Sequence, residues 1–482
     1  MKYQWTVLTV TTVGILMSGI DNSILVVGLP KVAAALHSDA EQAVWFTQSY
    51  ALAGTIMLLL MGRITDIFGR LKIYKAGFIV FTVGSLLVSL SQTADQMIVF
   101  RIIQGMGTAS LWSSSLALLT DSTPTRELGF SLGINQVAGR IGGIFGLTLS
   151  GVILLFFDWR FLFYINVPIG IFGTLWAHLK LKELGTRESG SPIDWFGFAA
   201  FSIFLTGITL SLTFAAYGIS ETGAVVAFLL LASVVSLMAF IVHERRTKFP
   251  LLDLSLLRIR EFSASTFGVL LSWTSTSSLL LLFSLYLQLV VGVSPFLAGS
   301  SLLPAQIAMV VAGPISGRFS DRLGKMPFLV GGLVLASVSA FMFSTVEQVT
   351  PYFYVALYLG IFGVGISAFL APNASLGMAA VPANRRGIAS SLRNLSFNVS
   401  SSLGFSLAIW LVTLSVPYGV VSSVISSGNA ALIPEAYRVA FFSGLRSAYI
   451  WLAIMNAFAL IPTLIGARKN KNRQIDSKLV NV

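Results

Sequence analysis

Apolar stretches of about twenty residues or more, separated by short polar turns, follow one another along nearly the whole chain. An α-helix needs about 20 mainly apolar residues to cross the hydrocarbon core of a membrane. The pattern therefore predicts an all-α polytopic membrane protein with fourteen membrane-spanning helices, and an even number places both termini on one side. The expected spans are 5–29, 42–61, 73–92, 96–119, 129–155, 160–180, 194–216, 222–242, 262–290, 296–316, 327–346, 352–379, 386–415 and 447–467.

Composition supports this interpretation and excludes several classes of function. Hydrophobic residues make up 55% of the 482 residues and charged residues only 10%, whereas a soluble domain carries about 25% charged residues. The chain has no cysteine, which excludes a disulfide framework, a cysteine zinc cluster and thiol catalysis. The first apolar segment shows no cleavage-site pattern, so it is interpreted as a membrane span rather than a removable signal peptide.

The positive charges are distributed unevenly between the two ends of the predicted spans. With the N-terminus inside, the inner segments carry 24 Lys and Arg, the outer loops carry four and the spans three, which makes the 31 of the sequence. Cytoplasmic loops are enriched in Lys and Arg in this way. The net charge of +12 therefore reflects orientation in the cytoplasmic membrane, with both termini cytoplasmic, and indicates no nucleic-acid partner.

A short signature occurs twice, each time between two apolar stretches. Its copies are Gly62-Arg-Ile-Thr-Asp66-Ile-Phe-Gly69-Arg70 and Gly317-Arg-Phe-Ser-Asp321-Arg-Leu-Gly324-Lys325. This repetition indicates a duplicated chain, and two similar helix bundles that rock about a central site are typical of transporters.

The distance between the copies predicts how the chain is divided. They are 317 − 62 = 255 residues apart, whereas the first six spans and their loops occupy about 190 residues, so a helix pair is inserted at roughly 193–242. The predicted layout is a six-helix bundle over 1–190, the inserted pair with a cytoplasmic linker over 191–261, and a second six-helix bundle over 262–482. The last part contains an external loop at about 416–446 and a basic cytoplasmic tail.

Asp21 is the only carboxylate well inside a predicted span. With Thr11, Gly14, Ser18 and Gly28 it follows a spacing of three and four residues, which places these residues on one helix face. Ionisable side chains inside a membrane are costly and commonly mark proton or ion pathways. The alternative is a structural ion pair that never exchanges a proton.

Arg101 is the expected partner of Asp21. Asp21 lies eight residues, or roughly 12 Å, from the outer end of its span, and Arg101 enters its own span from the same side by five residues, or roughly 7–8 Å. A nearby Arg keeps an aspartate ionised, and separation and desolvation favour the protonated form. Alternation between these surroundings would make Asp21 a proton carrier.

Other polar and aromatic residues within spans are candidates for substrate binding. Arg140 and Arg393 make the interior net positive, which disfavours a dicationic drug and favours neutral amphipathic compounds or organic anions. Alternatively, both arginines bond backbone carbonyls or extend to the membrane surface. The further substrate-binding candidates are Asn135, Asn394, Asn398, Gln288, Gln306, Trp112, Trp273 and Tyr50.

Two patterns that would indicate a nucleotide site or a metal site are absent from the sequence. The sequence contains no phosphate-binding loop of the G-x-x-x-x-G-K-[S/T] type, which disfavours transport driven by ATP. Its three histidines lie apart near span ends, which indicates no metal site. We therefore expect that the protein uses a proton gradient as its energy source and needs no cofactor. We also expect that it is not an enzyme.

Several ordered motifs carry a resemblance to a known family. They are Asp21-Asn-Ser-Ile-Leu-Val-Val-Gly-Leu-Pro30, Arg101-Ile-Ile-Gln104-Gly105-Met-Gly107, Trp159-Arg-Phe-Leu-Phe-Tyr-Ile-Asn166-Val-Pro168, and Tyr286-Leu-Gln288 followed by Gly299 and Pro304. Together with the signatures, they make residues 13–405 resemble the major facilitator superfamily, and within it the fourteen-span drug:proton antiporters.

The resemblance implies a fold, an activity and a role for the signatures. The fold is two six-helix bundles plus the inserted pair, and the activity is proton-coupled export of amphipathic small molecules by a monomer in the lipid bilayer. The signature loops are implied to latch one state of the transport cycle; the alternative is that their charges only orient the chain. The gating residues are Gly62, Arg63, Asp66, Gly69, Arg70, Gly317, Arg318, Asp321, Arg322 and Gly324.

The sequence departs from the family pattern in the fifth span. Leu147 stands where the antiporters usually have Pro, and Ser150 replaces a Gly. The small residues Gly142, Gly146 and Ser150 keep a spacing of four, which permits close approach of helices.

Two alternative functions stay open: a carrier of organic anions or lipid-like molecules with weak or no proton coupling, and a non-transporting membrane sensor on the same fold.

Overall fold

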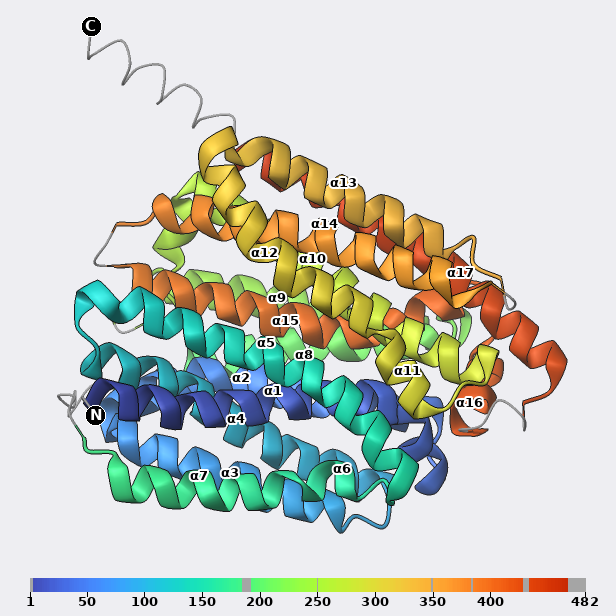
Figure 1. Ribbon diagram of the computed structural model, residues 1–482, viewed down its shortest axis with the longest axis horizontal. Coiled ribbons are helices and arrows are strands. Elements are labelled where there is room, and N and C mark those ends of the chain that lie inside the picture. Colours follow the sequence, from blue (N-terminus) through green and yellow to red (C-terminus); the bar gives the residue numbers. More distant parts are fainter. Residues whose placement is uncertain are drawn as a thin grey trace, which may run out of the picture. The chain divides into compact units, whose positions relative to one another are not determined.

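The computed structural model describes residues 3–183, 192–248, 250–347, 350–382, 385–427 and 433–466, and these contain helices and turns but no β-strand (Figure 1). The first half contains α1 (Tyr3–Ala35), α2 (Ala40–Phe68), α3 (Arg70–Ser89), α4 (Ala94–Ser122), α5 (Thr125–Phe156), α6 (Phe161–Tyr164), α7 (Asn166–Lys180), α8 (Trp195–Ala216) and α9 (Ile219–Glu244). The second half contains η1 (Leu254–Arg258), α10 (Arg260–Leu285), the π-helix η2 (Tyr286–Val291), α11 (Pro295–Ser301), α12 (Leu303–Leu323), α13 (Lys325–Phe343), α14 (Tyr352–Ala379), α15 (Arg386–Thr413), α16 (Tyr418–Ser427) and α17 (Glu435–Phe458).

Thirteen helical segments of the described residues are long and apolar enough to cross a membrane. The fourteenth predicted span is helix α4, which has 29 residues but is too polar to meet that criterion. Its polar side chains include Arg101, Gln104, Ser114 and Ser115, and all four are buried inside the protein. A helix whose polar groups face its neighbours needs less apolar surface toward lipid, which explains the difference.

The segment 416–446, predicted as an external loop, is mostly helical in its described residues, and its external location stays a prediction. Helix α16 occupies Tyr418–Ser427, and α17 begins at Glu435, twelve residues before the predicted start of the last span at 447. Arg438 and Arg446 interrupt the apolar pattern there. The helix accommodates Arg446 because its Nε donates to the carbonyl of Ser344 at 2.5 Å. The basic tail from 467 onwards lies outside the described residues.

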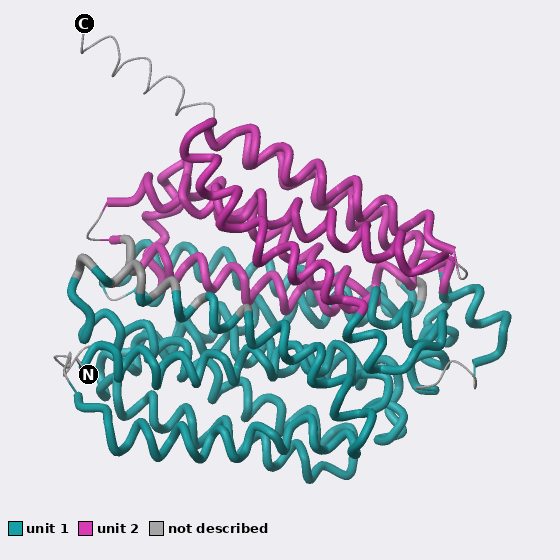
Figure 2. Tube along the Cα trace, in the orientation of Figure 1, with its two compact units in different colours: residues 1–251, 283–300, 416–441 teal, residues 252–282, 301–415, 442–482 magenta. Residues whose placement is uncertain are grey.

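The chain forms two compact units (Figure 2). The first contains residues 1–251, 283–300 and 416–441, and the second contains residues 252–282, 301–415 and 442–482. The helix pair α8–α9 therefore belongs to the first unit. Two segments from the second half of the sequence, 283–300 and 416–441, also belong to it. The division into parts predicted from the duplication stays a prediction.

Helices α1 and α5 pack against each other in the first unit through glycine. A Cβ atom at Gly142 or Gly146 would collide with the backbone carbonyl oxygens of Leu16 and Ile20 respectively. The close approach predicted from the small residues of the fifth span is therefore confirmed. Gly107 allows the same closeness of α4 to the backbone of Phe81 on α3. Helices α1 and α5, and likewise α3 and α4, are thus closely packed pairs.

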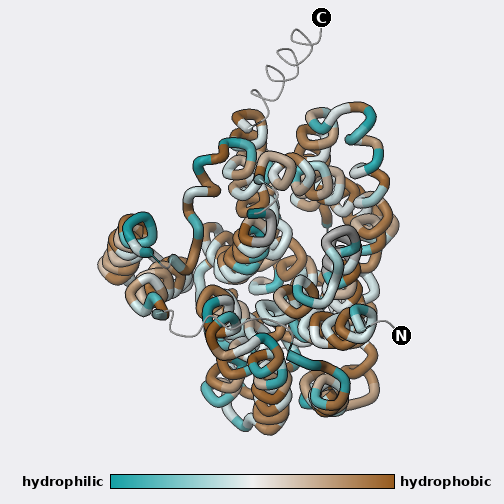
Figure 3. Tube along the Cα trace, turned by 90° about the vertical axis from the view of Figure 1, so that its left-hand side faces the viewer, coloured by the Kyte–Doolittle hydropathy of each residue, from teal (hydrophilic) through white to brown (hydrophobic). Residues whose placement is uncertain are grey.

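In the second unit, α14 packs against both α12 and α13. Gly363 on α14 approaches the backbone of Ala305, and Gly365 approaches that of Ala336. Apolar residues dominate the tubes of the helices, while hydrophilic residues gather at turns and helix ends (Figure 3). This distribution is the one expected of helices that cross a membrane.

Candidate functional site

Asp21 and Arg101 form a buried ion pair, as predicted. The Asp21 side chain is 0% exposed and the Arg101 side chain 1% exposed. An NH1 nitrogen of Arg101 donates to Oδ2 of Asp21 at 2.6 Å. Buried charges require such pairing because removal from water costs several kcal/mol for each ion. Helix α1 and helix α4 thus meet at the position that the helical rise predicted.

Two amides complete the hydrogen bonding of the carboxylate. The Nε2 of Gln104 and the Nδ2 of Asn166 each donate to Oδ1 of Asp21 at 2.8 Å. Gln104 also accepts from Arg101 at 2.7 Å and donates to Ser85 at 2.7 Å. Neither amide was among the predicted site residues, although both stand in the motifs quoted above. Asn166 begins α7 directly after the short helix α6, so its position depends on a helix break.

The guanidinium of Arg101 is held on its other sides by backbone and aromatic groups. Its Nε donates to the carbonyl of Phe46 at 2.9 Å. Its Cζ lies 4.1 Å from the ring centroid of Tyr50 and 5.5 Å from that of Phe163. Tyr50 in turn shares a hydrogen bond of 2.8 Å with Thr108. Tyr50, which was predicted to bind substrate, therefore lies beside the ion pair.

A second polar cluster lies between α1, α4 and α5. Nδ2 of Asn135 donates to the hydroxyls of Thr11 at 3.1 Å and Ser115 at 3.2 Å. The Thr11 hydroxyl donates its single hydrogen within its own helix, to the backbone carbonyl of Val7 at 2.9 Å. Toward Asn135 its oxygen can therefore only accept a hydrogen bond. Asn135 must therefore present its NH2 group to Thr11. Its own carbonyl oxygen is buried, and no hydrogen-bond partner is found for it among the described residues.

Trp112 contributes to the same region from α4. Its indole nitrogen donates to Ser18 of α1 at 2.9 Å. A Cβ atom added at Gly139 would lie 3.3 Å from the Trp112 ring, so the ring lies close against α5. Of the two predicted residues of α5, Asn135 thus joins this cluster, whereas the side chain of Arg140 lies outside the described part of the structure.

In the second unit, Arg393 and Trp273 share one aromatic neighbour. The NH1 of Arg393 donates to Ser265 at 3.2 Å, and its Cζ lies 5.4 Å from the ring centroid of Phe397. Phe397 makes an edge-to-face contact with Trp273 at 5.2 Å between centroids. The indole of Trp273 donates to Ser401 at 3.0 Å. These predicted residues therefore belong to one cluster on α10 and α15.

The other predicted amides make hydrogen bonds of their own or are partly exposed. Asn398 is exposed and donates to the backbone carbonyl of Asn394 at 2.9 Å. Gln306 is half-buried near the start of α12. Gln288 is buried in the π-helix and donates to the backbone carbonyl of Val27 at 3.0 Å, within the first unit.

The first signature loop is held by ion pairs and by a helix cap. Arg70 forms an ion pair with Asp121 at the end of α4 and a longer one, of 3.7 Å, with Asp66. The carboxylate of Glu183 accepts from the backbone N–H groups of Arg70 at 2.9 Å and Leu71 at 3.2 Å. These N–H groups have no partner within their own helix, and a carboxylate there is favoured by the helix dipole. Half-buried Arg63 lies one turn before Asp66 on α2.

The glycines of the two signatures occupy equivalent positions. Gly69 and Gly324 both separate two helices and have φ angles of 104° and 93°, a backbone region that residues with a side chain rarely adopt. A Cβ at Gly62 would lie 4.0 Å from Ser113 on α4, and one at Gly317 would lie 3.7 Å from Ala371 on α14. In the second copy, Arg318, Asp321 and Arg322 have exposed side chains.

A comparison with family models identifies the chain. The model described as Major Facilitator Superfamily matches residues 11–405. The chain belongs to the Major Facilitator Superfamily. The family predicted from the motifs is thereby confirmed, and the molecule is a multi-pass membrane transporter by family and fold.

Relatives of this chain are named for different transported compounds. The "Riboflavin transporter RibZ" of Clostridioides difficile (strain 630) is 29% identical, with 83% of this chain and 88% of the relative covered. The "Tetracenomycin C resistance and export protein" of Streptomyces glaucescens is 28% identical, with 83% and 74% covered. This drug-export relative agrees with the predicted antiporter branch of the major facilitators.

Solved structures support the same fold. A bacterial homolog of the human lysosomal transporter Spinster, in an inward-facing and unoccupied conformation, matches with a TM-score of 0.68 at 17% identity, covering 96% of this chain and 97% of that chain. At this level of identity, the match shows that the chain has the major facilitator fold.

Proposed function

We propose that this major facilitator is a proton-coupled secondary transporter that exports amphipathic small molecules across the cytoplasmic membrane. The observation that carries the proposal is the Asp21–Arg101 pair, fully buried and linked by a contact of 2.6 Å. A carboxylate kept inside a membrane protein is costly to retain and typically marks a proton or ion pathway. Both termini would be cytoplasmic, as the distribution of Lys and Arg indicates.

Asp21 would carry the proton by exchanging its partners. In the present arrangement, the carboxylate accepts hydrogen bonds from Arg101, Gln104 and Asn166. Movement of α1 relative to α4 would break these contacts and favour uptake of a proton. Return of the contacts would release it. Gln104 and Asn166 would act as positioning residues, since they hold the carboxylate toward Arg101.

The substrate is proposed to bind beside the Asn135 cluster. The buried carbonyl oxygen of Asn135 is an acceptor without a partner among the described residues, which suits an N–H or O–H group of a ligand. Trp112 lies next to this cluster and offers a flat aromatic face. A planar amphipathic molecule with one hydrogen-bond donor combines these properties. The ion pairs of Arg70 would stabilise one conformation of the cycle.

Transport by reconstituted protein with an imposed pH gradient tests the proton coupling. Asp21→Asn should abolish gradient-driven transport, because the amide has nearly the size of the carboxylate but cannot exchange a proton. Substrate exchange at equal pH on both sides should continue. Asp158→Asn is the matched control, since that carboxylate is 53% exposed and pairs with Arg160 near the surface, and it should transport normally. Gradient-driven transport in Asp21→Asn liposomes would refute the proposal.

A second candidate is a carrier of neutral or anionic metabolites or lipid-like molecules with weak proton coupling. It is favoured by the relative whose name specifies riboflavin and by the positive side chain of Arg393, which lies beside Phe397. A panel of a lipophilic cation, a lipophilic carboxylate and riboflavin, assayed in the same liposomes, separates the two. Transport of riboflavin or the carboxylate that is unchanged by Asp21→Asn would favour the second candidate.

A further inference from the structure

The side chains that contact the Asp21 carboxylate all present hydrogen-bond donors to it. Arg101 donates to Oδ2 at 2.6 Å, and the amides of Gln104 and Asn166 donate to Oδ1 at 2.8 Å. An ionised carboxylate only accepts hydrogen bonds, so these partners fit it. A protonated carboxyl group also has an O–H that needs an acceptor. The observed contacts therefore serve one protonation state of Asp21 and leave the other without a partner.

Burial makes a missing acceptor costly. Asp21 is 0% exposed, and a buried donor without a partner loses more free energy than a typical hydrogen bond contributes. Among the described residues, the titratable groups beside Asp21 are Arg101 on α4 and Tyr50 on α2, while α3 and α7 bring uncharged side chains to the network. Arginine has no acceptor atom, and the Tyr50 hydroxyl is bonded to Thr108 at 2.8 Å. The acceptor must therefore come from one of the two amides.

The amide of Gln104 is fixed in its present orientation. Its Oε1 accepts from Arg101 at 2.7 Å, and its Nε2 donates to Ser85 at 2.7 Å as well as to Asp21. Turning this amide over would place its NH2 group against the guanidinium of Arg101. Because both groups only donate, they could not form a hydrogen bond. Gln104 therefore offers no acceptor to Asp21 while Arg101 stays beside it.

The amide of Asn166 has an unused acceptor. Its side chain is buried, and no hydrogen-bond partner is found for its Oδ1 among the described residues. The terminal torsion of asparagine has roughly two-fold preferences, so a rotation of about half a turn exchanges its NH2 group and its oxygen. After this rotation the oxygen would face Asp21, and the NH2 group would take the place of the unpartnered oxygen. Asn166 can therefore present either a donor or an acceptor to the carboxyl group.

We propose that Asn166 is the hydrogen-bond acceptor of protonated Asp21, and that its amide turns over when the carboxylate takes up a proton. In the ionised state, Nδ2 of Asn166 donates to Oδ1 of Asp21. When a proton from water forms the O–H of the carboxyl group, this O–H donates to Oδ1 of Asn166, and no covalent bond of the amide changes. One amide thereby serves both protonation states. The inference rests on the proton-carrying role proposed for Asp21.

The place of Asn166 on α7 suits this role in the proposed cycle. Helix α7 lies along α3 and packs against α1 as well (Figure 1). The proposed cycle separates α1 from α4, and α4 carries both Arg101 and Gln104. A partner on α7 does not depend on α4, so it would stay beside Asp21 after the donors of α4 have moved away. Asn166 would then be the partner that the proton meets.

Asn456 makes a similar contact in the second unit without a titrating partner. Its Nδ2 donates to the hydroxyl of Ser275 at 2.7 Å, and no partner is found for its buried Oδ1 among the described residues. Ser275 donates its own hydrogen to the carbonyl of Leu452 at 3.1 Å, so it needs no acceptor from the amide. An unused amide oxygen alone therefore does not indicate a proton site, and Asn456→Leu provides a matched control.

Infrared difference spectra between acid and neutral pH measure the orientation of the amide. The protein is reconstituted in lipid with asparagine isotopically labelled at its side-chain carbonyl, so that shifted bands belong to asparagine side chains. If the amide turns over, the Asn166 carbonyl gains an O–H partner, and its stretching band moves to lower wavenumber on acidification. An amide that only donates would give no shift or a shift to higher wavenumber, because its bond to the charged carboxylate weakens on protonation.

Variants assign the band to its residue. The downward shift should be lost in Asp21→Asn, because no proton is taken up there, and in Asn166→Leu, which removes the amide. Asn166→Thr gives a second assignment with a smaller side chain in case the leucine variant does not fold. Asn456→Leu should keep the shift, because its amide contacts a hydroxyl that does not titrate.

The outcomes distinguish this inference from failure of the proton coupling itself. The carboxyl band that is lost in Asp21→Asn reports whether Asp21 takes up a proton. This band together with a downward shift of the Asn166 band is the expected result. If the carboxyl band is present, an Asn166 band that stays in place or moves upward would overturn the inference alone, as would a downward shift that persists in the Asn166 variants. Absence of the carboxyl band would overturn the inference together with the proposed proton coupling.

Discussion

Replacing Arg101 should be among the most destabilising single changes in this protein. Arg101→Leu would remove the partner of a carboxylate that is 0% exposed and bonded to it at 2.6 Å. Breaking a buried pair from one side typically costs about 3–5 kcal/mol, because the remaining charge is left uncompensated. Gln104 and Asn166 would still donate to Asp21, so we expect a value near the lower limit, about 3 kcal/mol.

The size of the pair interaction follows from a double-mutant cycle. Asp21→Asn should cost less than Arg101→Leu, because Arg101 keeps the Phe46 carbonyl, the Gln104 oxygen and the face of Tyr50 as partners. The double variant should be more stable than the sum of the single effects predicts, by about 2–3 kcal/mol, in the upper part of the range for residues in contact.

Equilibrium unfolding of purified protein in mixed detergent micelles measures these free energies. Asp158→Asn with Arg160→Gln is the matched cycle at an exposed pair, where coupling should stay under about 1 kcal/mol. A cost of Arg101→Leu below about 1 kcal/mol, or additive effects at the buried pair, would refute the reasoning, since water would then have to reach the carboxylate.

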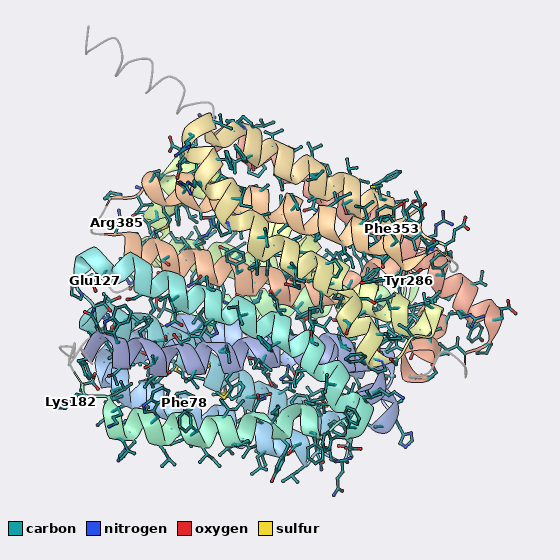
Figure 4. The ribbon with its side chains drawn as sticks, viewed as in Figure 1. Phe78, Glu127, Lys182, Tyr286, Phe353 and Arg385 are labelled. Atoms are coloured by element: carbon teal, nitrogen blue, oxygen red, sulfur yellow. The ribbon has the colours of Figure 1, made fainter. Side chains whose placement is uncertain are left out.

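Two further changes address backbone strain and charge outside the membrane. Gly324→Ala should lower the free energy of unfolding by about 1–2 kcal/mol. The φ angle there is 93° and a Cβ would meet no atom within 4 Å, so the loss would come from backbone strain alone. Gly331→Ala is the control, because this glycine is equally open but helical, and the change should not destabilise the protein. At the linker, burial raises the pKa of Asp253, but hydrogen bonds from Ser255 and from Arg385 outweigh this and lower the pKa below its usual value of 3.8. Arg385 is labelled in Figure 4. A lowered pKa stabilises the fold at pH above the unfolded value of about 3.9, and this stability is lost as the pH falls through the folded value. Arg385→Gln should therefore reduce thermal stability modestly, by about 0.5–1 kcal/mol, at neutral pH, and the difference from the natural protein should vanish in acid; a constant difference between pH 7 and pH 2 would contradict this.

The Asp21–Arg101 pair could be predicted because it depends on two lengths alone. The helical rise fixes how deep each side chain lies, and the order of the spans fixes the end from which each depth is counted. The amides of Gln104 and Asn166 could not be predicted in the same way. Gln104 reaches Asp21 through the packing of α4 against α1, and Asn166 depends on the break between α6 and α7. Hydropathy carries no information on either.

Element ends were predicted least well where charge lies within a helix. The early start of α17 was missed because Arg438 and Arg446 resemble loop residues in a hydropathy pattern. The hydrogen bonds from residues 283–300 to α1 could not be predicted for a different reason. In the sequence, α10 and the π-helix form one continuous apolar span, and only tertiary hydrogen bonds such as that from Ser284 to Val26 reveal that the segment is joined to α1.

The two signature loops show which part of a motif a duplication preserves. Gly69 and Gly324 have nearly the same positive φ. The turn conformation depends on the glycine itself, so a copied sequence keeps it. The ion pair of Arg70 depends on Asp121, which another helix supplies. Helix α14 packs against α12 as α4 packs against α2. The end of α14 has the sequence Gly377-Met-Ala-Ala-Val381, which contains no carboxylate. The side chains of Asp321 and Arg322 are exposed. Among the residues that the structure describes, the turn is therefore duplicated, whereas the pairing of Arg70 with a carboxylate at the end of the neighbouring helix is found only at the first loop.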